Sequence, residues 1–151
     1  MAINFIEYQL MRFLRQQNAL PLGGDLLELG ETNWYGDVDP NILRADIREF
    51  AALAKQESLL AELDEAIRYK KPDRHWDIAK IYWNTFLQPS SMTAIDFHGS
   101  EKALKLVLNS TIDLKRQFHI VSNGGTLEHI FNVAQALKTV HHHTLYYLVD
   151  S

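Results

Sequence analysis

The strongest indication of fold in this chain is Asp25-Leu26-Leu27-Glu28-Leu29-Gly30-Glu31-Thr32-Asn33-Trp34-Tyr35-Gly36. It opens with a short apolar run that ends at Gly30 and follows Gly23-Gly24, and such a run between glycines predicts a buried strand. Glu28 interrupts the run, and a buried carboxylate is costly unless a partner or a ligand satisfies it. Open α/β sheets bind ligands at the carboxyl ends of their strands, so we expect a binding site where this strand ends.

The bulk composition is that of one ordinary globular domain. The chain has 151 residues, 46% of them hydrophobic, and a formal net charge of −4, which argues against a broad basic surface for nucleic acid or an anionic membrane. It contains no cysteine, so disulfides, thiol catalysis and thiolate metal sites are excluded. No apolar stretch reaches the roughly 20 residues of a membrane span. Residues 1–18 carry Glu7 within their apolar pattern, which is unlike a signal peptide, so we expect a cytoplasmic protein.

Hydrophobic periodicity predicts alternating strands and helices. The predicted strands are residues 26–29, 92–97, 104–108, 118–122 and 144–149, and the predicted helices are residues 5–20, 42–69 (one or two helices with a break near Ser58), 76–87 and 127–140. This order favours an α/β fold with a parallel sheet of about five strands and right-handed crossovers. We expect a single domain over residues 1–151, with residues 42–88 as a helical insertion after the first strand.

Polar side chains follow three of the predicted strands. They are Glu28 and Glu31, then Asp96 and His98, and finally Asn123, Glu128 and His129. Because the carboxyl ends of parallel strands meet at one edge, we expect these groups to converge. An acid after the second strand can accept both hydrogen bonds of a ribose diol. A full Gly-x-Gly-x-x-Gly is missing, so a pyrophosphate has no obvious cradle, and an acid at the first strand end suits a cationic ligand such as an amino or sulfonium group.

Three motifs carry a resemblance to a known family. They are Leu-Glu-Leu-Gly-Glu with Asn33-Trp34-Tyr35-Gly36, the strand end Ile-Asp-Phe-His-Gly at residues 95–99, and the run from Val121 to His129. Together they resemble the Rossmann-like S-adenosylmethionine-dependent methyltransferases, over roughly residues 26–36 and 93–140. The resemblance implies a Rossmann-like fold and methyl transfer from S-adenosylmethionine to a small-molecule acceptor. Sheets of that family have seven strands and this chain supplies about five, so we expect a shortened member.

The resemblance also implies a role for each candidate site residue. Glu28, Gly30 and Glu31 would flank the methionine part of the cofactor. Asp96 would bind the ribose hydroxyls, with Phe97 and His98 beside the adenosine and Asn109 near the adenine end. Asn123, Gly124 and Thr126 would line the sulfonium and acceptor side.

Several residues have two interpretations from sequence alone. Glu128 and His129 open a helix, where an acid is stabilised by the helix dipole, and they are also the candidates for a catalytic base. The run His141-His142-His143 suggests a metal, but three consecutive side chains cannot all face one ion, so we expect none. The apolar stretch Tyr146-Tyr147-Leu148 predicts an edge strand that favours a homodimer.

A second reading of the whole chain is a non-catalytic, methyltransferase-like module that acts through self-association or a protein partner. In that reading the exposed sheet edge is one contact surface and the aromatic helix over residues 76–87 is the other. We expect the aromatic side chains Trp76, Tyr82 and Trp83 of this helix to lie more often in the core.

Overall fold

The structure, a computed structural model, describes residues 2–35, 38–69 and 73–145. The chain divides into two compact units, each of them built from two segments. The helical unit comprises Met1–Gly23 and Thr32–Pro89, and the sheet unit comprises Gly24–Glu31 and Ser90–Ser151. Among the described residues, no helix combines the length and apolar character needed to cross a membrane.

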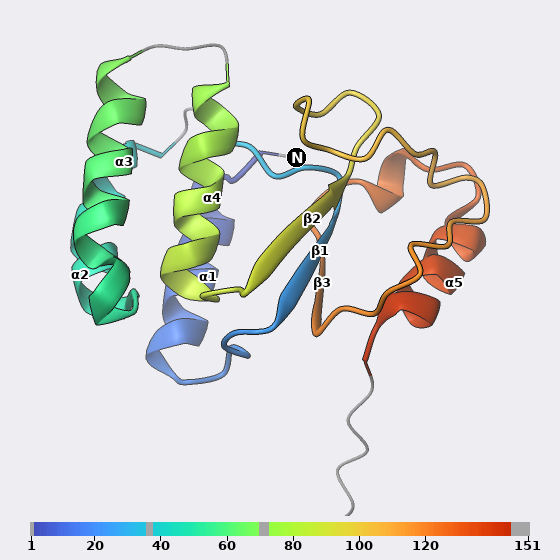
Figure 1. The fold of residues 1–151 in the computed structure, drawn as a ribbon, viewed down its shortest axis with the longest axis horizontal. Helices are drawn as coiled ribbons and strands as arrows, with labels where there is room; N and C mark the ends of the chain where they lie inside the picture. Colours follow the sequence, from blue (N-terminus) through green and yellow to red (C-terminus); the bar gives the residue numbers. More distant parts are fainter. Residues whose placement is uncertain (1, 36–37, 70–72, 146–151) are drawn as a thin grey trace, which may run out of the picture. The chain divides into compact units, whose positions relative to one another are not determined.

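The helical unit contains four α-helices (Figure 1). Its elements are α1 (Phe5–Gln16), the 3₁₀ turn η1 (Pro40–Ile42), α2 (Leu43–Phe50), the 3₁₀ turn η2 (Leu53–Lys55), α3 (Gln56–Arg68) and α4 (Arg74–Phe86). Asn4 starts α1 with a capping box, in which its side chain accepts from the Glu7 N–H and its own N–H donates to the Glu7 carboxylate. The predicted break in the second helical region lies at residues 51–55, ahead of Ser58.

An aromatic cluster forms the core of the helical unit. Tyr8 of α1 lies edge-on to Trp34 and to Phe86, with ring centroids 5.9 and 5.8 Å apart. Tyr82 and Trp83 of α4 are both buried. The expectation that the aromatic side chains of this helix serve mainly as core is therefore confirmed for these two residues.

The described residues of the sheet unit form three parallel strands in the order β2-β1-β3. They are β1 (Asp25–Leu29), β2 (Ser91–Ile95) and β3 (Ile120–Asn123), followed by the 3₁₀ turn η3 (Leu127–His129) and α5 (Val133–His143). Leu27 and Leu29 of the central strand pack with Ile95 and Phe118 in an apolar cluster, against which Val140 of α5 also packs. The apolar run that we used to predict the first strand thus forms the centre of the sheet.

The prediction of about five strands is wrong, because the described part of the chain has three. In the predicted strand 104–108, only Leu104 makes a bridge, to Ile95, and the chain then turns. In the predicted strand 144–149, Thr144 bridges Phe118, and residues 146–149 lie outside the described residues. The architecture is therefore α/β with a three-stranded parallel sheet, which is compatible with a Rossmann-like fold.

Candidate functional site

The three strands end at the same level of the sheet. Leu29 of β1 is in register with Ile95 of β2 and with Asn123 of β3. The segments that follow are residues 30–31, 96–100 and 124–126, and we call them, with the last residue of each strand, the rim. Because β2 and β3 flank β1 on opposite sides, the rim includes the point at which the strand order reverses, where open α/β sheets bind ligands.

The side chains at these strand ends do not all converge. Residues in register in a parallel sheet point to the same face, so Asn123 shares the face of Leu27 and Leu29. Glu28 lies one residue earlier and points to the opposite face, where it is buried. The expectation of one common lip therefore holds for the backbone ends of the strands, but Glu28 and Asn123 are separated by the sheet.

Asp96 joins the ends of β1 and β2. Its Oδ2 accepts a hydrogen bond of 2.9 Å from the N–H of Glu31, and its Oδ1 accepts one of 2.9 Å from the N–H of His98. The residue is half-buried. An ionised carboxylate offers about four acceptor positions, so each oxygen can accept one further hydrogen bond.

Glu31 holds the loop after β2 through its side chain. Its Oε1 accepts from Ser100 Oγ at 2.8 Å and its Oε2 accepts from the Ser100 N–H at 2.5 Å. A Cβ atom on Gly99 would lie 2.7 Å from Glu31 Oε2, so the absence of a side chain at Gly99 permits this approach. The buried carboxylate of Glu31 thus has a structural role in the rim.

Two rings project from the rim directly after Asp96. Phe97 is 58% exposed and His98 is also exposed, and their rings meet edge-on with centroids 5.3 Å apart. An exposed phenyl ring beside a carboxylate is a suitable platform for a flat, hydroxyl-bearing ligand.

The turn after β3 packs onto the turn after β1. The Oδ1 of Asn123 accepts hydrogen bonds from the N–H groups of Thr126 and Leu127, at 3.3 and 3.1 Å, and so shapes the turn that contains Gly124. Gly30 has φ +81°, and a Cβ there would lie 2.0 Å from Thr126 Oγ1. Thr126 therefore lies against the backbone at Gly30, and both residues shape the same part of the rim.

The remaining candidates lie in loops and turns outside the rim. Asn109 is exposed, and its Oδ1 accepts a hydrogen bond of 2.7 Å from the N–H of Asn132, the residue that caps α5. Glu128 and His129 are exposed on η3, a 3₁₀ turn. We expected both residues to open an α-helix. They lie instead on this short turn, because α5 begins later, at Val133.

Two residues that make hydrogen bonds in the rim region are not among the candidates identified from the sequence. Ser100 donates twice to Glu31, and Lys105 Nζ donates to the carbonyl oxygens of Gly99 and Ser100 at 2.6 and 2.8 Å. Neither belongs to a spacing motif, so the sequence contained no signal for them.

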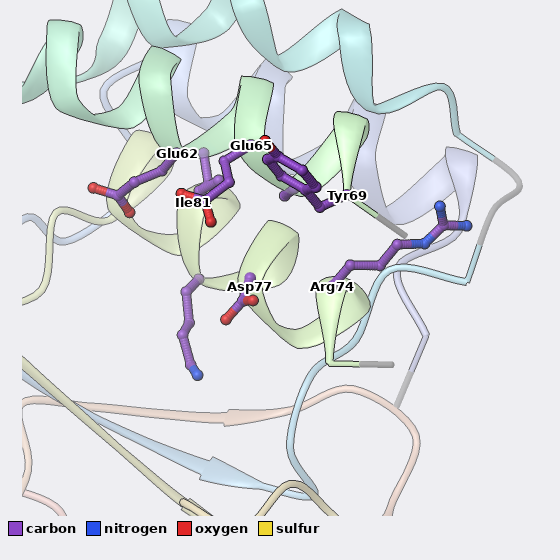
Figure 2. Close-up of a pocket in the computed structure, with 8 residues that line it drawn as sticks. Glu62, Glu65, Tyr69, Arg74, Asp77 and Ile81 are labelled. Carbon is purple, nitrogen blue, oxygen red and sulfur yellow. The ribbon is translucent and has the colours of Figure 1, made fainter. Parts of the chain in front are cut away.

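Two pockets are lined by described residues that do not belong to the rim. One, of about 210 Å³, lies between α3 and α4 in the helical unit (Figure 2). Its labelled lining residues include charges of both signs, the acids Glu62, Glu65 and Asp77 and the base Arg74, beside the uncharged Tyr69 and Ile81. The other is a groove of about 850 Å³ in the sheet unit, between α5 and residues 111–113.

Comparisons with known proteins return no relative for this chain: no family model matches it, and neither a curated protein nor a solved structure matches it.

Proposed function

We propose that the rim binds the adenosyl part of S-adenosylmethionine and that the chain transfers the cofactor's methyl group to a small-molecule acceptor. The observation that supports this most is the position of Asp96, which directly follows β2 at the level of Gly30, the residue after β1. Both carboxylate oxygens have remaining acceptor capacity for the two hydroxyls of a ribose.

The two rings after Asp96 extend the same proposal to the adenine. Phe97 and His98 are exposed beside the carboxylate, so a base that enters with its ribose on Asp96 can stack on Phe97. Glu31 adds a second carboxylate to the rim, where it accepts two hydrogen bonds from Ser100. The negative charge of these two acids favours the sulfonium of S-adenosylmethionine over a phosphate-bearing nucleotide.

Catalysis in this proposal depends chiefly on alignment of the acceptor atom, the methyl carbon and the sulfur. Glu128 and His129 are the candidates for a general base, which is needed only when the acceptor must lose a proton. Both side chains are exposed on η3, which directly follows the rim turn at Thr126.

Calorimetric titration of the whole chain with S-adenosylhomocysteine tests the proposal. Micromolar binding is expected, and Asp96→Asn should weaken it at least about tenfold because it removes the charge from one bidentate contact. Glu101→Gln, which neutralises an exposed acid in the same loop, is the matched control and should leave binding unchanged. Absence of binding to the unmodified chain would reject the proposal.

A second candidate is a non-catalytic module that associates with another copy of the chain. It is favoured by α1, on which Ile6, Leu10 and Phe13 recur at helical spacing and are 78%, 55% and 56% exposed. Sedimentation analysis of the chain and of Leu10→Lys tests this: a dimer that dissociates in the variant, together with no binding of S-adenosylhomocysteine, supports the second candidate.

The first candidate also includes a location and a set of partners. It places the reaction in the cytoplasm, with a small acceptor as the partner and with neither nucleic acid nor a membrane involved. Both candidate functions include a homodimer. The edge strand that we predicted to favour it, Tyr146-Tyr147-Leu148, lies outside the described residues.

A further inference from the structure

The end of α5 brings two imidazoles beside the loop that precedes β3. His142 and His143 are the last residues of α5, and Asp113 belongs to that loop. One nitrogen of each ring and one carboxylate oxygen of Asp113 all lie within 4.8 Å of one another. The fold therefore assembles three side chains of metal-binding type from two distant parts of the chain.

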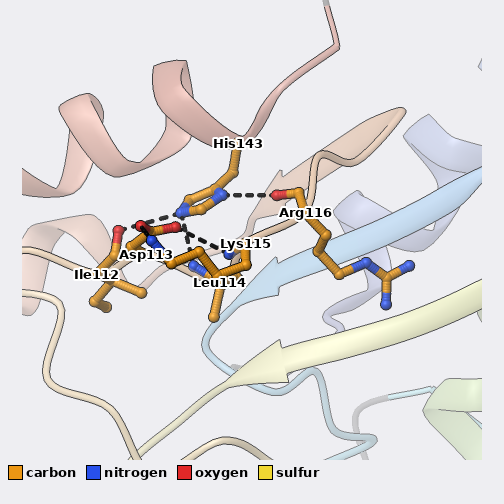
Figure 3. Close-up of polar contacts among 6 residues, drawn as sticks. All are labelled: Ile112, Asp113, Leu114, Lys115, Arg116 and His143. Atoms are coloured by element: carbon orange, nitrogen blue, oxygen red, sulfur yellow. Dashed lines mark hydrogen bonds and ion pairs between the residues drawn. The ribbon is translucent and has the colours of Figure 1, made fainter.

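The ring of His143 is fixed in the orientation of a metal ligand. The side chain is 1% exposed, and its Nδ1 lies 2.8 Å from the carbonyl oxygen of Arg116 (Figure 3). In the tautomer with the proton on Nδ1, the ring donates to that oxygen and the lone pair is on Nε2. A backbone carbonyl that accepts from one ring nitrogen is the usual support for a histidine that binds metal through the other.

The Nε2 atom of His143 has one acceptor and one donor beside it. The carbonyl oxygen of Ile112 lies 3.2 Å from Nε2, and the Leu114 N–H donates to Nε2 over a longer 3.3 Å (Figure 3). A bound cation would take the Nε2 lone pair in place of the Leu114 N–H. In a tetrahedral zinc site the ligand atoms are about 3.3 Å apart, given bonds of about 2.0–2.1 Å. The 3.2 Å between His143 Nε2 and the Ile112 oxygen fits this spacing, which makes the Ile112 oxygen a candidate fourth ligand.

An ion can reach this position from solvent. His142 and Asp113 are exposed and both line the groove of about 850 Å³ that runs along α5. The amino group of Lys115 is paired with Asp113 (Figure 3). The Lys115 side chain is 84% exposed, so its displacement by a cation costs little.

We propose that Asp113, His142 and His143 bind a divalent transition-metal cation, best fitted by Zn²⁺, which clamps the end of α5 to the loop before β3. Two imidazoles and one carboxylate suit zinc, and also copper and nickel, better than magnesium or calcium. The sequence-based objection that three consecutive histidines cannot face one ion still stands for His141–His143. Here two of them take part, and the third side chain comes from Asp113, which the sequence did not connect with them.

Calorimetric titration of the untagged, chelator-stripped chain with zinc chloride tests the site. Binding is expected, and His142→Asn and Asp113→Asn should each weaken it at least about tenfold, the lower limit for loss of even an outer-shell partner. Both side chains are exposed, so these variants should keep the fold, which a thermal melt in chelator verifies. His141→Asn is the matched control from the same histidine run and should bind zinc as the unmodified chain does.

The outcomes distinguish a specific zinc site from adventitious binding of the ion. Loss of affinity in His142→Asn and Asp113→Asn, with none in His141→Asn, supports the proposal. No binding to the unmodified chain overturns it, and so does unchanged affinity in Asp113→Asn. An equal loss in His141→Asn and His142→Asn also overturns it, since the histidine run alone would then bind the ion.

Discussion

The carboxylate of Glu31 accepts two hydrogen bonds from Ser100, one from the backbone N–H and one from the hydroxyl. Glu31 directly follows the turn after β1, and Ser100 lies in the loop after β2, 69 residues further along the chain. The same loop begins with Asp96, which accepts from the N–H of Glu31. These reciprocal bonds connect the two strand ends and fix the part of the rim that we propose binds the adenosyl group.

Ser100→Ala should destabilise the chain by about 1.5–3 kcal/mol, because it removes a hydrogen bond to a buried, charged carboxylate. Unfolding in urea, followed by circular dichroism, measures the change. Ser110→Ala, at an exposed serine in the following turn, is the control and should change the unfolding free energy by less than about 0.5 kcal/mol. Equal stability of the Ser100→Ala variant and the unmodified chain would contradict the role assigned to the Glu31–Ser100 pair.

Gly30→Ala should be more destabilising than Gly23→Ala. Both glycines have positive φ, +81° and +76°, so each substitution strains the backbone by roughly 1–2 kcal/mol. A Cβ at Gly30 also meets Thr126 Oγ1 at 2.0 Å, whereas nothing lies within 4 Å of a Cβ at Gly23. The comparison of urea midpoints isolates the steric part.

The double variant Gly30→Ala/Thr126→Ala gives the control for that steric part. Removal of the Thr126 hydroxyl should restore part of the stability lost in Gly30→Ala. If both single glycine variants lose the same stability, the close packing of Thr126 on Gly30 is not supported.

Tyr8→Phe should destabilise the helical unit by about 2 kcal/mol. The Tyr8 hydroxyl donates to the carboxylate of Asp46, which is buried and also accepts from Arg12 Nε at 2.9 Å. The substitution leaves a buried charge with one donor fewer. Tyr82→Phe is the control, because it removes a hydroxyl from the same aromatic cluster without changing a hydrogen bond to Asp46. In thermal unfolding it should lower the stability less than Tyr8→Phe does.

Acid should weaken the sheet unit through Asp25. The hydroxyl of Ser91 and the guanidinium of Arg116 bind its carboxylate at 2.6 and 2.9 Å and hold the pKa of Asp25 below its usual value. Because the folded pKa is the lower one, this contribution is complete above the unfolded pKa of about 3.9 and is lost as the pH falls through the folded pKa. Asp25→Asn should flatten the fall in unfolding free energy between pH 5 and pH 2, whereas Glu101→Gln should not.

The sequence predicted the central strand and the rim level well, for identifiable reasons. An apolar run between glycines leaves β1 few alternatives, and parallel strands place their carboxyl ends together. The number of strands was overestimated because an apolar stretch does not show how many of its residues pair with a neighbouring strand. Leu104 pairs with Ile95 at a single position, and Lys105 then binds the carbonyls of the preceding turn.

The sequence could not show to which face of the sheet each site side chain points. Whether Glu28 and Asn123 share a face depends on the register of β1 against β3, and a shift of one residue reverses the answer. The metal-type cluster was missed for a related reason, since Asp113 meets His142 only through the packing of α5.

The most direct test of the central claim is a titration of the ¹⁵N-labelled chain with S-adenosylhomocysteine, followed through its backbone amide signals. Binding at the rim should shift the signals of Gly30, Glu31 and residues 97–99 in a saturable manner. Unchanged signals at a saturating excess of the ligand, or shifts confined to the pocket between α3 and α4, would contradict it.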